Sequence, residues 1–148
     1  MIDDEYLLAS LRTAAGHDPM PAHVAASSRD LYTLRLVRAD TANPLECAAN
    51  RGVRGGAGPR MVRFATEELL FEFEVTIGDG LIDLSGHISP HPGQDATVEI
   101  RTPHLTVIRS PAGGGQFAAT GLPPGWFSVV CHRPGLHPVA TRWVRIRP

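Results

Sequence analysis

The alternation of apolar and polar residues is clearest in the second half of the chain, where it predicts β-strands. Within residues 71–77, Phe, Val and Ile alternate with Glu and Thr, which is typical of a strand buried on one face. Gly78-Asp79-Gly80 then predicts a tight turn into a second strand over residues 81–88. Further strands are expected near residues 97–101, 105–109, 116–120, 126–132 and 141–147. The pattern predicts a seven- to eight-stranded antiparallel β-sandwich.

The first forty residues follow a helical spacing instead. Leu7 and Leu11 lie four residues apart on one face of a first helix. A second helix is expected to begin at Pro21 and to carry Leu31 and Leu34 on its apolar face. Helices this short are marginal in water. They must therefore pack against the rest of the chain or against a partner. Together with the strands, these helices predict a fold that is mainly β with an N-terminal α segment.

Glycine and proline divide the chain into three parts. A run of glycines between residues 52 and 58, followed by Pro59, predicts a flexible connector. The expected organisation is a helical segment over residues 1–40, a connector over residues 41–60 and a β-sandwich over residues 61–148.

Charge and cysteine content exclude several classes of protein. The formal net charge is −1, and all 14 basic residues are arginine. This balance argues against a strongly electrostatic nucleic-acid or membrane binder. No apolar run reaches the length of a membrane-spanning helix, and the acidic N-terminus does not resemble a secretory signal. Cys47 and Cys131 form no disulfide framework, so we expect free thiols and a cytoplasmic location.

Two motifs in the second half suggest a family. One is Leu84-Ser85-Gly86-His87-Ile88, and the other runs from Gly115-Gln116-Phe117 to Gly121-Leu122-Pro123-Pro124-Gly125-Trp126-Phe127. Together they resemble the carboxypeptidase-regulatory-like, or transthyretin-like, β-sandwich domain over residues 81–147. In this pattern Phe117 is expected to pack inward, and the Pro-Pro-Gly turn leads into a central strand.

The layout of the whole chain also resembles small actinobacterial proteins. The shared features are an acidic N-terminus, Asp18-Pro19-Met20-Pro21 and Gly58-Pro59-Arg60. Such proteins are often encoded beside alternative sigma factors or CHAT-domain peptidases. The resemblance implies a regulatory or adaptor protein whose partner is a sigma factor or a CHAT-domain peptidase.

The histidines and cysteines do not predict a catalytic site. His87 and His91 would share one face of a helix, but Pro90 and Pro92 exclude a helix there. A metal-dependent hydrolase at these histidines is the least favoured alternative. Adjacent Cys131 and His132 would point to opposite faces of a strand. The transthyretin-like ureide hydrolases end in Tyr-Arg-Gly-Ser, which this chain lacks. We therefore expect no enzyme, no metal and no cofactor.

The remaining hypotheses concern binding. The preferred function is a non-catalytic interaction module in which Leu7, Leu11, Leu31 and Leu34 contact a partner protein. The same leucines could instead pack on the chain's own sheet. The alternative function is a carbohydrate or small-ligand module that uses Trp126 and Trp143. Glu67, Glu68, Glu72 and Glu74 predict an acidic outer face near one strand pair.

Overall fold

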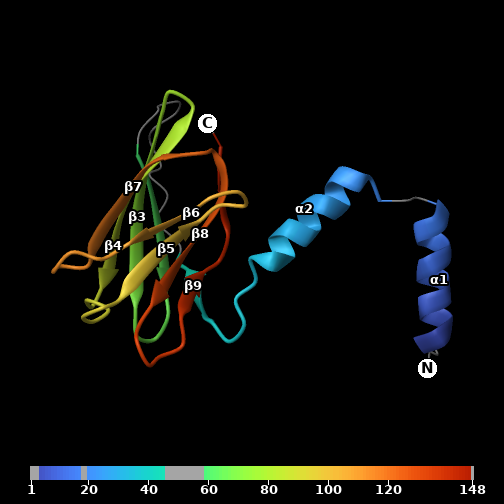
Figure 1. The fold of residues 1–148 in the computed structure, drawn as a ribbon, viewed down its shortest axis with the longest axis horizontal. Coiled ribbons are helices and arrows are strands. Elements are labelled where there is room, and N and C mark those ends of the chain that lie inside the picture. Colours follow the sequence, from blue (N-terminus) through green and yellow to red (C-terminus); the bar gives the residue numbers. More distant parts are fainter. Residues whose placement is uncertain (1–3, 18–19, 46–58, 148) are drawn as a thin grey trace. The chain divides into compact units, whose positions relative to one another are not determined.

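The computed structural model describes residues 4–17, 20–45 and 59–147 and is mainly β, with two helices, the first at the N-terminus (Figure 1). The chain divides into two compact units, Met1–Arg35 and Leu36–Pro148. The first unit contains both helices and the second contains the strands. The boundary thus lies five residues before the end of the predicted helical segment, and most of the predicted connector falls outside the described residues.

The helical unit contains α1 (Asp4–His17) and α2 (Ala22–Thr33). Asp4 and Glu5 lie in the first turn of α1, where negative charge is favourable beside the free N–H groups. α2 ends at Thr33, so Leu34, which was expected on its apolar face, lies just beyond the helix. Five residues after the helix ends, Arg38 adopts a positive φ of 63°, which is not a right-handed helical conformation.

The second unit is built from short strands. They are β1 (Asp40–Pro44), β2 (Arg60–Ala65), β3 (Leu70–Gly78), β4 (Leu81–Ser89), β5 (Thr97–Arg101), β6 (Thr106–Arg109), β7 (Gln116–Leu122), β8 (Gly125–His132), β9 (Val139–Thr141) and β10 (Val144–Ile146). The predicted turn between β3 and β4 is confirmed. Asp79 and Gly80 both have positive φ, at 50° and 76°, as a two-residue type I′ turn requires.

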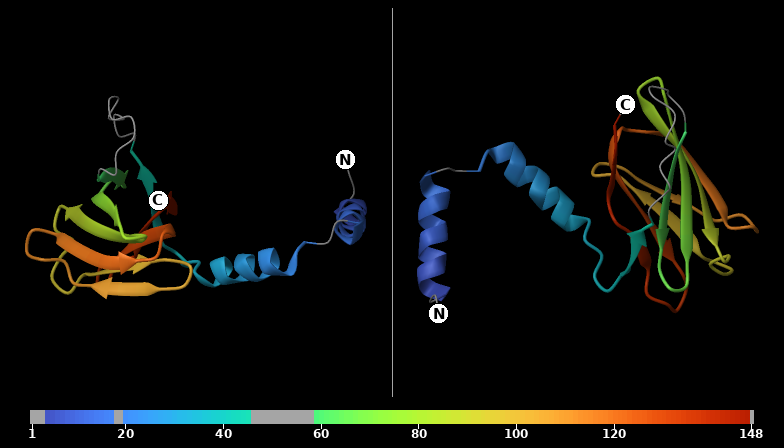
Figure 2. Two further views of the ribbon diagram at one scale, coloured as in Figure 1. Left: turned by 90° about the horizontal axis from the view of Figure 1, so that it is seen from above. Right: turned by 180° about the vertical axis from the view of Figure 1, so that it is seen from behind.

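The strands form one ten-stranded sheet that curls into a nearly closed barrel (Figure 2), in the order β6-β5-β8-β9-β1-β2-β3-β4-β7, with β10 paired to β8. The described residues form ten strands, more than the seven to eight predicted, and these strands form one curled sheet rather than a clear two-sheet sandwich. β1, most of which lies in the predicted connector, joins the two halves of the sheet. It pairs in parallel with β9 and antiparallel with β2.

The two ends of the sheet approach each other at β6 and β7. The guanidinium of Arg109 on β6 donates through Nε to the carbonyl of Ala118 on β7, at 3.1 Å. The same side chain donates to the carbonyl of Ile108 at 2.9 Å. Arg109 therefore bridges the seam where, among the described strands, no backbone pairing closes the barrel.

All five phenylalanines of the chain meet in one core. The Phe73 ring lies 6.0–6.3 Å, between centroids, from the four others: Phe64, Phe71, Phe117 and Phe127. The first three belong to the same half of the sheet as Phe73, whereas Phe127 comes from β8 in the other half. Phe73 therefore ties both halves to one core, and Phe117 packs inward as predicted.

The segment from β9 to β10 contains one residue more than the stretch of β8 that it pairs with. Val130 pairs with Ala140, and Phe127, three residues earlier, pairs with Val144, four residues later. The extra residue makes a β-bulge beside β8. The sequence predicted one strand over residues 141–147, and the bulge divides that region into two.

Candidate functional site

The predicted partner-binding leucines have different surroundings. Leu7 and Leu11 lie on α1 and are 48% and 57% exposed. Leu8, which the sequence reading omitted, extends the same apolar stripe and is also exposed. Leu34 lies one residue beyond the end of α2 and is partly buried. The side chain of Leu31 lies outside the described residues. α1 therefore carries the clearest exposed apolar surface. Leu8 lies three residues before Leu11, so the helical spacing could have identified it as part of the stripe.

The two tryptophans are offset by two residues in the strand register. Trp126 is the second residue of β8 and is 44% exposed, and Trp143 lies in the bulge just before β10 and is partly buried. The guanidinium carbon of Arg145 lies 6.0 Å from the centre of the Trp126 ring, a cation–π contact. One face of Trp126 is therefore next to a cation. A stacking platform for a neutral sugar would need that face free.

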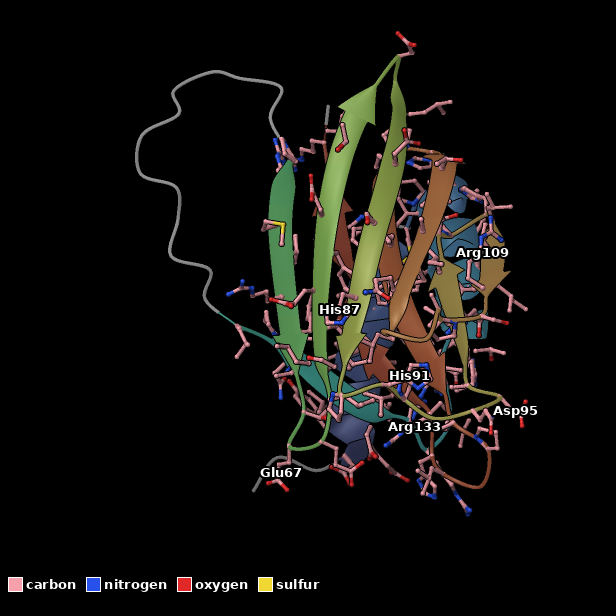
Figure 3. All side chains as sticks on the ribbon, turned by 90° about the vertical axis from the view of Figure 1, so that its left-hand side faces the viewer. Glu67, His87, His91, Asp95, Arg109 and Arg133 are labelled. Carbon is pink, nitrogen blue, oxygen red and sulfur yellow. The ribbon has the colours of Figure 1, made fainter. Side chains whose placement is uncertain are left out.

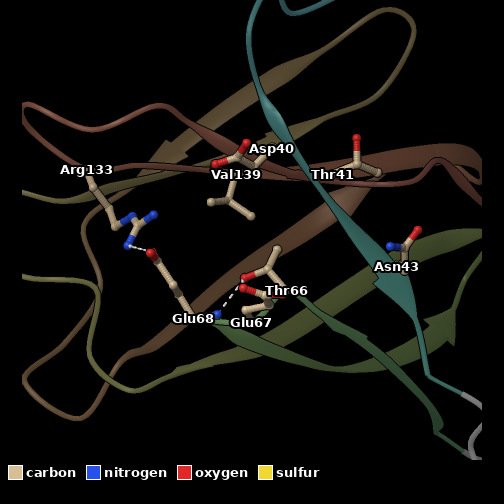
Figure 4. A pocket seen from close by; sticks show the side chains of 8 residues that line it. All are labelled: Asp40, Thr41, Asn43, Thr66, Glu67, Glu68, Arg133 and Val139. Carbon is tan, nitrogen blue, oxygen red and sulfur yellow. Dashed lines mark hydrogen bonds and ion pairs between the residues drawn. The ribbon is translucent and has the colours of Figure 1, made fainter.

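Polar residues line an open cavity of about 390 Å³ between β1, the β2–β3 turn and the β8–β9 loop (Figure 4). Arg133 donates to Glu68 at 2.9 Å, and Thr66 Oγ1 accepts from the Glu68 and Leu69 amides. Asp40 and Glu67 add two more carboxylates to the wall. These contacts hold the β2–β3 turn and the β8–β9 loop together. The polar residues of this cavity therefore have a structural role.

The predicted acidic face is divided between two places. Glu67 and Glu68 belong to the β2–β3 turn at the lower end of the sheet in Figure 3, whereas Glu72 and Glu74 lie on β3. Glu72 forms an ion pair with Arg63 at 2.9 Å, and its other oxygen lies 3.6 Å from Nδ1 of His87. A neighbouring cation thus neutralises Glu72.

His87 and His91 do not come together. The Nε2–H group of His87 donates to the Gly114 carbonyl at 2.8 Å, whereas Nδ1 of His91 accepts from the Gly93 amide at 3.1 Å. His91 lines a second open cavity, of about 500 Å³, between the β4–β5 and β6–β7 loops (Figure 3). Within the part of the chain that the structure describes, no three His, Cys, Asp or Glu side chains are grouped to hold a metal.

Cys131 is a core residue. It is fully buried, and this burial raises the pKa of its thiol to about 11, although the charge of Arg133 partly opposes the shift. The thiol is therefore protonated and unreactive near neutral pH. His132 points the other way and hydrogen-bonds to Glu99 at 2.7 Å, so the two residues form no dyad. Cys47 lies outside the described residues.

Comparison with known proteins finds no matching family model, no matching curated relative and no matching solved structure. No helix in the described ranges is long and apolar enough to cross a membrane.

Proposed function

We propose that this chain is a non-catalytic interaction module whose helix α1 docks in an apolar groove of a partner protein. The observation that carries the proposal is the stripe of Leu7, Leu8 and Leu11, all exposed on one helix of 14 residues. Leucines at i and i+4 are the usual anchors of a helix that binds in a groove. An isolated helix of this length is marginal in water, so a partner would stabilise it while covering the stripe.

The contact between the two sequence motifs supports a relationship to carboxypeptidase-regulatory-like domains. Gly86 of the first motif pairs with Phe117 of the second, and the Phe117 ring lies over the glycine. In this proposal the β unit is a variant of that sandwich in which β1 joins the two halves. By the same resemblance, a sigma factor or a CHAT-domain peptidase encoded nearby is the first partner to test, and the cytoplasm is the compartment.

The test compares two charge substitutions on α1. Leu11→Asp places a carboxylate in the stripe, and Ala9→Asp places the same charge on the opposite side of the helix. A pull-down from native lysate, read by mass spectrometry, should capture a stoichiometric partner with the wild-type and Ala9→Asp proteins. Loss of a buried leucine and burial of a charge should weaken capture by Leu11→Asp at least about tenfold.

Thermal unfolding separates docking from folding. If the stripe contacts a partner, Leu11→Asp leaves the melting temperature unchanged. A lower melting temperature for Leu11→Asp alone would mean that the stripe packs within the chain's own fold. Equal capture by both variants would also contradict the proposal.

A further inference from the structure

The outer face of β5, β8 and β10 differs from the rest of the surface of the β unit. Phe127, Val129 and Cys131 of β8 point into the core. The residues between them, Ser128 and Val130, point the opposite way and are nevertheless buried. β8 is therefore buried on both faces.

Arg101 is the most unusual of these side chains. It faces Ser128 across the β5–β8 ladder, and its side chain is only 8% exposed. Its Nε is buried without a hydrogen bond, and the nearest carboxylate oxygen, on Glu99, is 3.4 Å away. The second oxygen of Glu99 is already bonded to His132. The ion pair with Glu99 compensates the charge, but a buried Nε without a hydrogen bond is costly, so a further anion beside this side chain would be favourable.

A second cation and both tryptophans lie beside Arg101 on the same face. Arg145 of β10 pairs with Trp126 of β8 and lies over its ring. The bulge between β9 and β10 places Arg142 and Trp143 opposite Ser128. Bulges commonly redirect a side chain at a functional surface. The register therefore gathers arginine and tryptophan around one buried serine.

The charges and shape of this face indicate its ligand. The groups that face outward here are Arg101, Arg142, Arg145 and His132, with Glu99 as the one carboxylate among the described residues of these strands, together with Thr97, Thr106, Ile108 and the two tryptophans. Of the residues that line the two cavities described above, Thr97 alone belongs to this face, and the arginines and tryptophans of the face line neither. A basic and apolar face outside these cavities fits an extended segment better than a compact ligand.

We propose that this face, defined by Arg101, Trp126, Trp143 and Arg145, binds an acidic, extended segment of a partner protein. β5 and β10 flank β8, so the α-carbons of Arg101 and Arg145 are separated by two strand spacings across and two residues along, about 12 Å. Carboxylates four residues apart in an extended chain are separated by about 13 Å. One such pair would reach both guanidinium groups, with an apolar residue between them over Trp126.

A nucleic acid would also offer anions and flat bases, but the chain as a whole fits it less well. Stable binding of a phosphate backbone needs many cations, because the electrostatic term grows with the number of phosphates neutralised. Here the net charge is −1, which gives no long-range attraction for a polyanion. Two carboxylates need only the two local arginines.

Intrinsic fluorescence tests the proposal directly, because both tryptophans of the chain lie on this face. The full chain is titrated with a blocked nine-residue peptide of Ser and Thr that carries Glu at its third and seventh positions and Leu at its fifth. A saturable change in emission is expected with this peptide and none with the same peptide carrying Gln for Glu. An equal response to both, or no saturable change at millimolar peptide, overturns the proposal.

Matched variants identify the side chains. Arg145→Gln should weaken the peptide at least about fivefold, as expected for loss of a charge-assisted hydrogen bond. Arg60→Gln removes the same charge from β2, in the other half of the sheet, and should change the affinity less than about twofold. If Arg145→Gln binds like Arg60→Gln, the proposal fails.

Two further titrations separate this site from its alternatives. An oligothymidylate that binds more tightly than the acidic peptide would make the face a nucleic-acid site and overturn the assignment. The Leu11→Asp chain should bind the peptide like the wild type, because the four residues that define the face all belong to the β unit. The helix proposal and this one can therefore fail separately.

Discussion

Gly86 shows how one missing side chain organises the core. It pairs with Phe73 on β3 and with Phe117 on β7, so two phenylalanines flank it on neighbouring strands. Their rings meet edge to face, with centroids 6.0 Å apart. A Cβ atom at position 86 would overlap the Phe117 ring. The glycine is needed here for space, because the rings cover the backbone where a side chain would stand.

Gly86→Ala should therefore destabilise the β unit. Phe117 is almost fully buried, so its ring must move into a packed core, and such overpacking costs about 1–3 kcal/mol in the free energy of unfolding. Urea denaturation measures this change. Gly78→Ala is the matched control, since Gly78 also lies in a strand but has no heavy atom within 4 Å of the added Cβ. Equal midpoints for the two variants would show that the ring yields without cost.

The sequence predicted some of these residues and missed others for a physical reason. The inward direction of Phe117 could be predicted, because it follows from the local alternation of apolar and polar residues within its motif. The contact between Gly86 and Phe117 depends on which strands pair, and these residues lie thirty-one positions apart in the chain. Arg101 reads as an ordinary outward polar residue in the alternation of β5. It is buried in a sheet where β8 lies beside β5, and this pairing of distant segments is not contained in a local pattern.

At the scale of elements, the hairpin of β3 and β4 was the most predictable part of the fold. Its alternation is strict, and its turn residues are those that positive φ angles demand. β1 was the least predictable. Its residues, Asp-Thr-Ala-Asn-Pro, have low strand propensity, and only Ala42 is buried. β1 is a strand because β2 and β9 offer it backbone partners.

The hairpin turn supplies a prediction at this scale. Gly80 has a φ of 76°, a conformation that costs an L-residue about 1 kcal/mol, so Gly80→Ala should lower the free energy of unfolding by about that amount. Asp79 already tolerates a positive φ as aspartate can, and Asp79→Gly should change it by less than about 0.5 kcal/mol. Thermal or urea unfolding measures both. A neutral Gly80→Ala would mean that the turn relaxes to another type.

At the scale of the molecule, local patterns predicted the class of the fold but not its closure. A mainly β unit after two helices follows from the periods of two and 3.6 residues in the sequence. The single ten-stranded sheet does not. Its continuity depends on the parallel pairing of β1 with β9, between residues about one hundred positions apart, and its seam depends on one arginine side chain. Both are contacts between segments that the sequence order keeps apart.

The division into two units gives the last prediction. Among the described residues, the hydrophobic core runs from Ala42 to Ile146, so the β unit contains its own core. A chain of residues 36–148 should therefore melt within about 2 °C of the full chain, a shift that corresponds to well under 1 kcal/mol for a domain of this size. Circular dichroism of the two chains should differ by the signal of α1 and α2 alone. A melting temperature lower by about 5 °C or more would show that the helical unit stabilises the sheet. In that case the leucines of α1 would serve the chain's own fold, and the docking proposal would lose its main support.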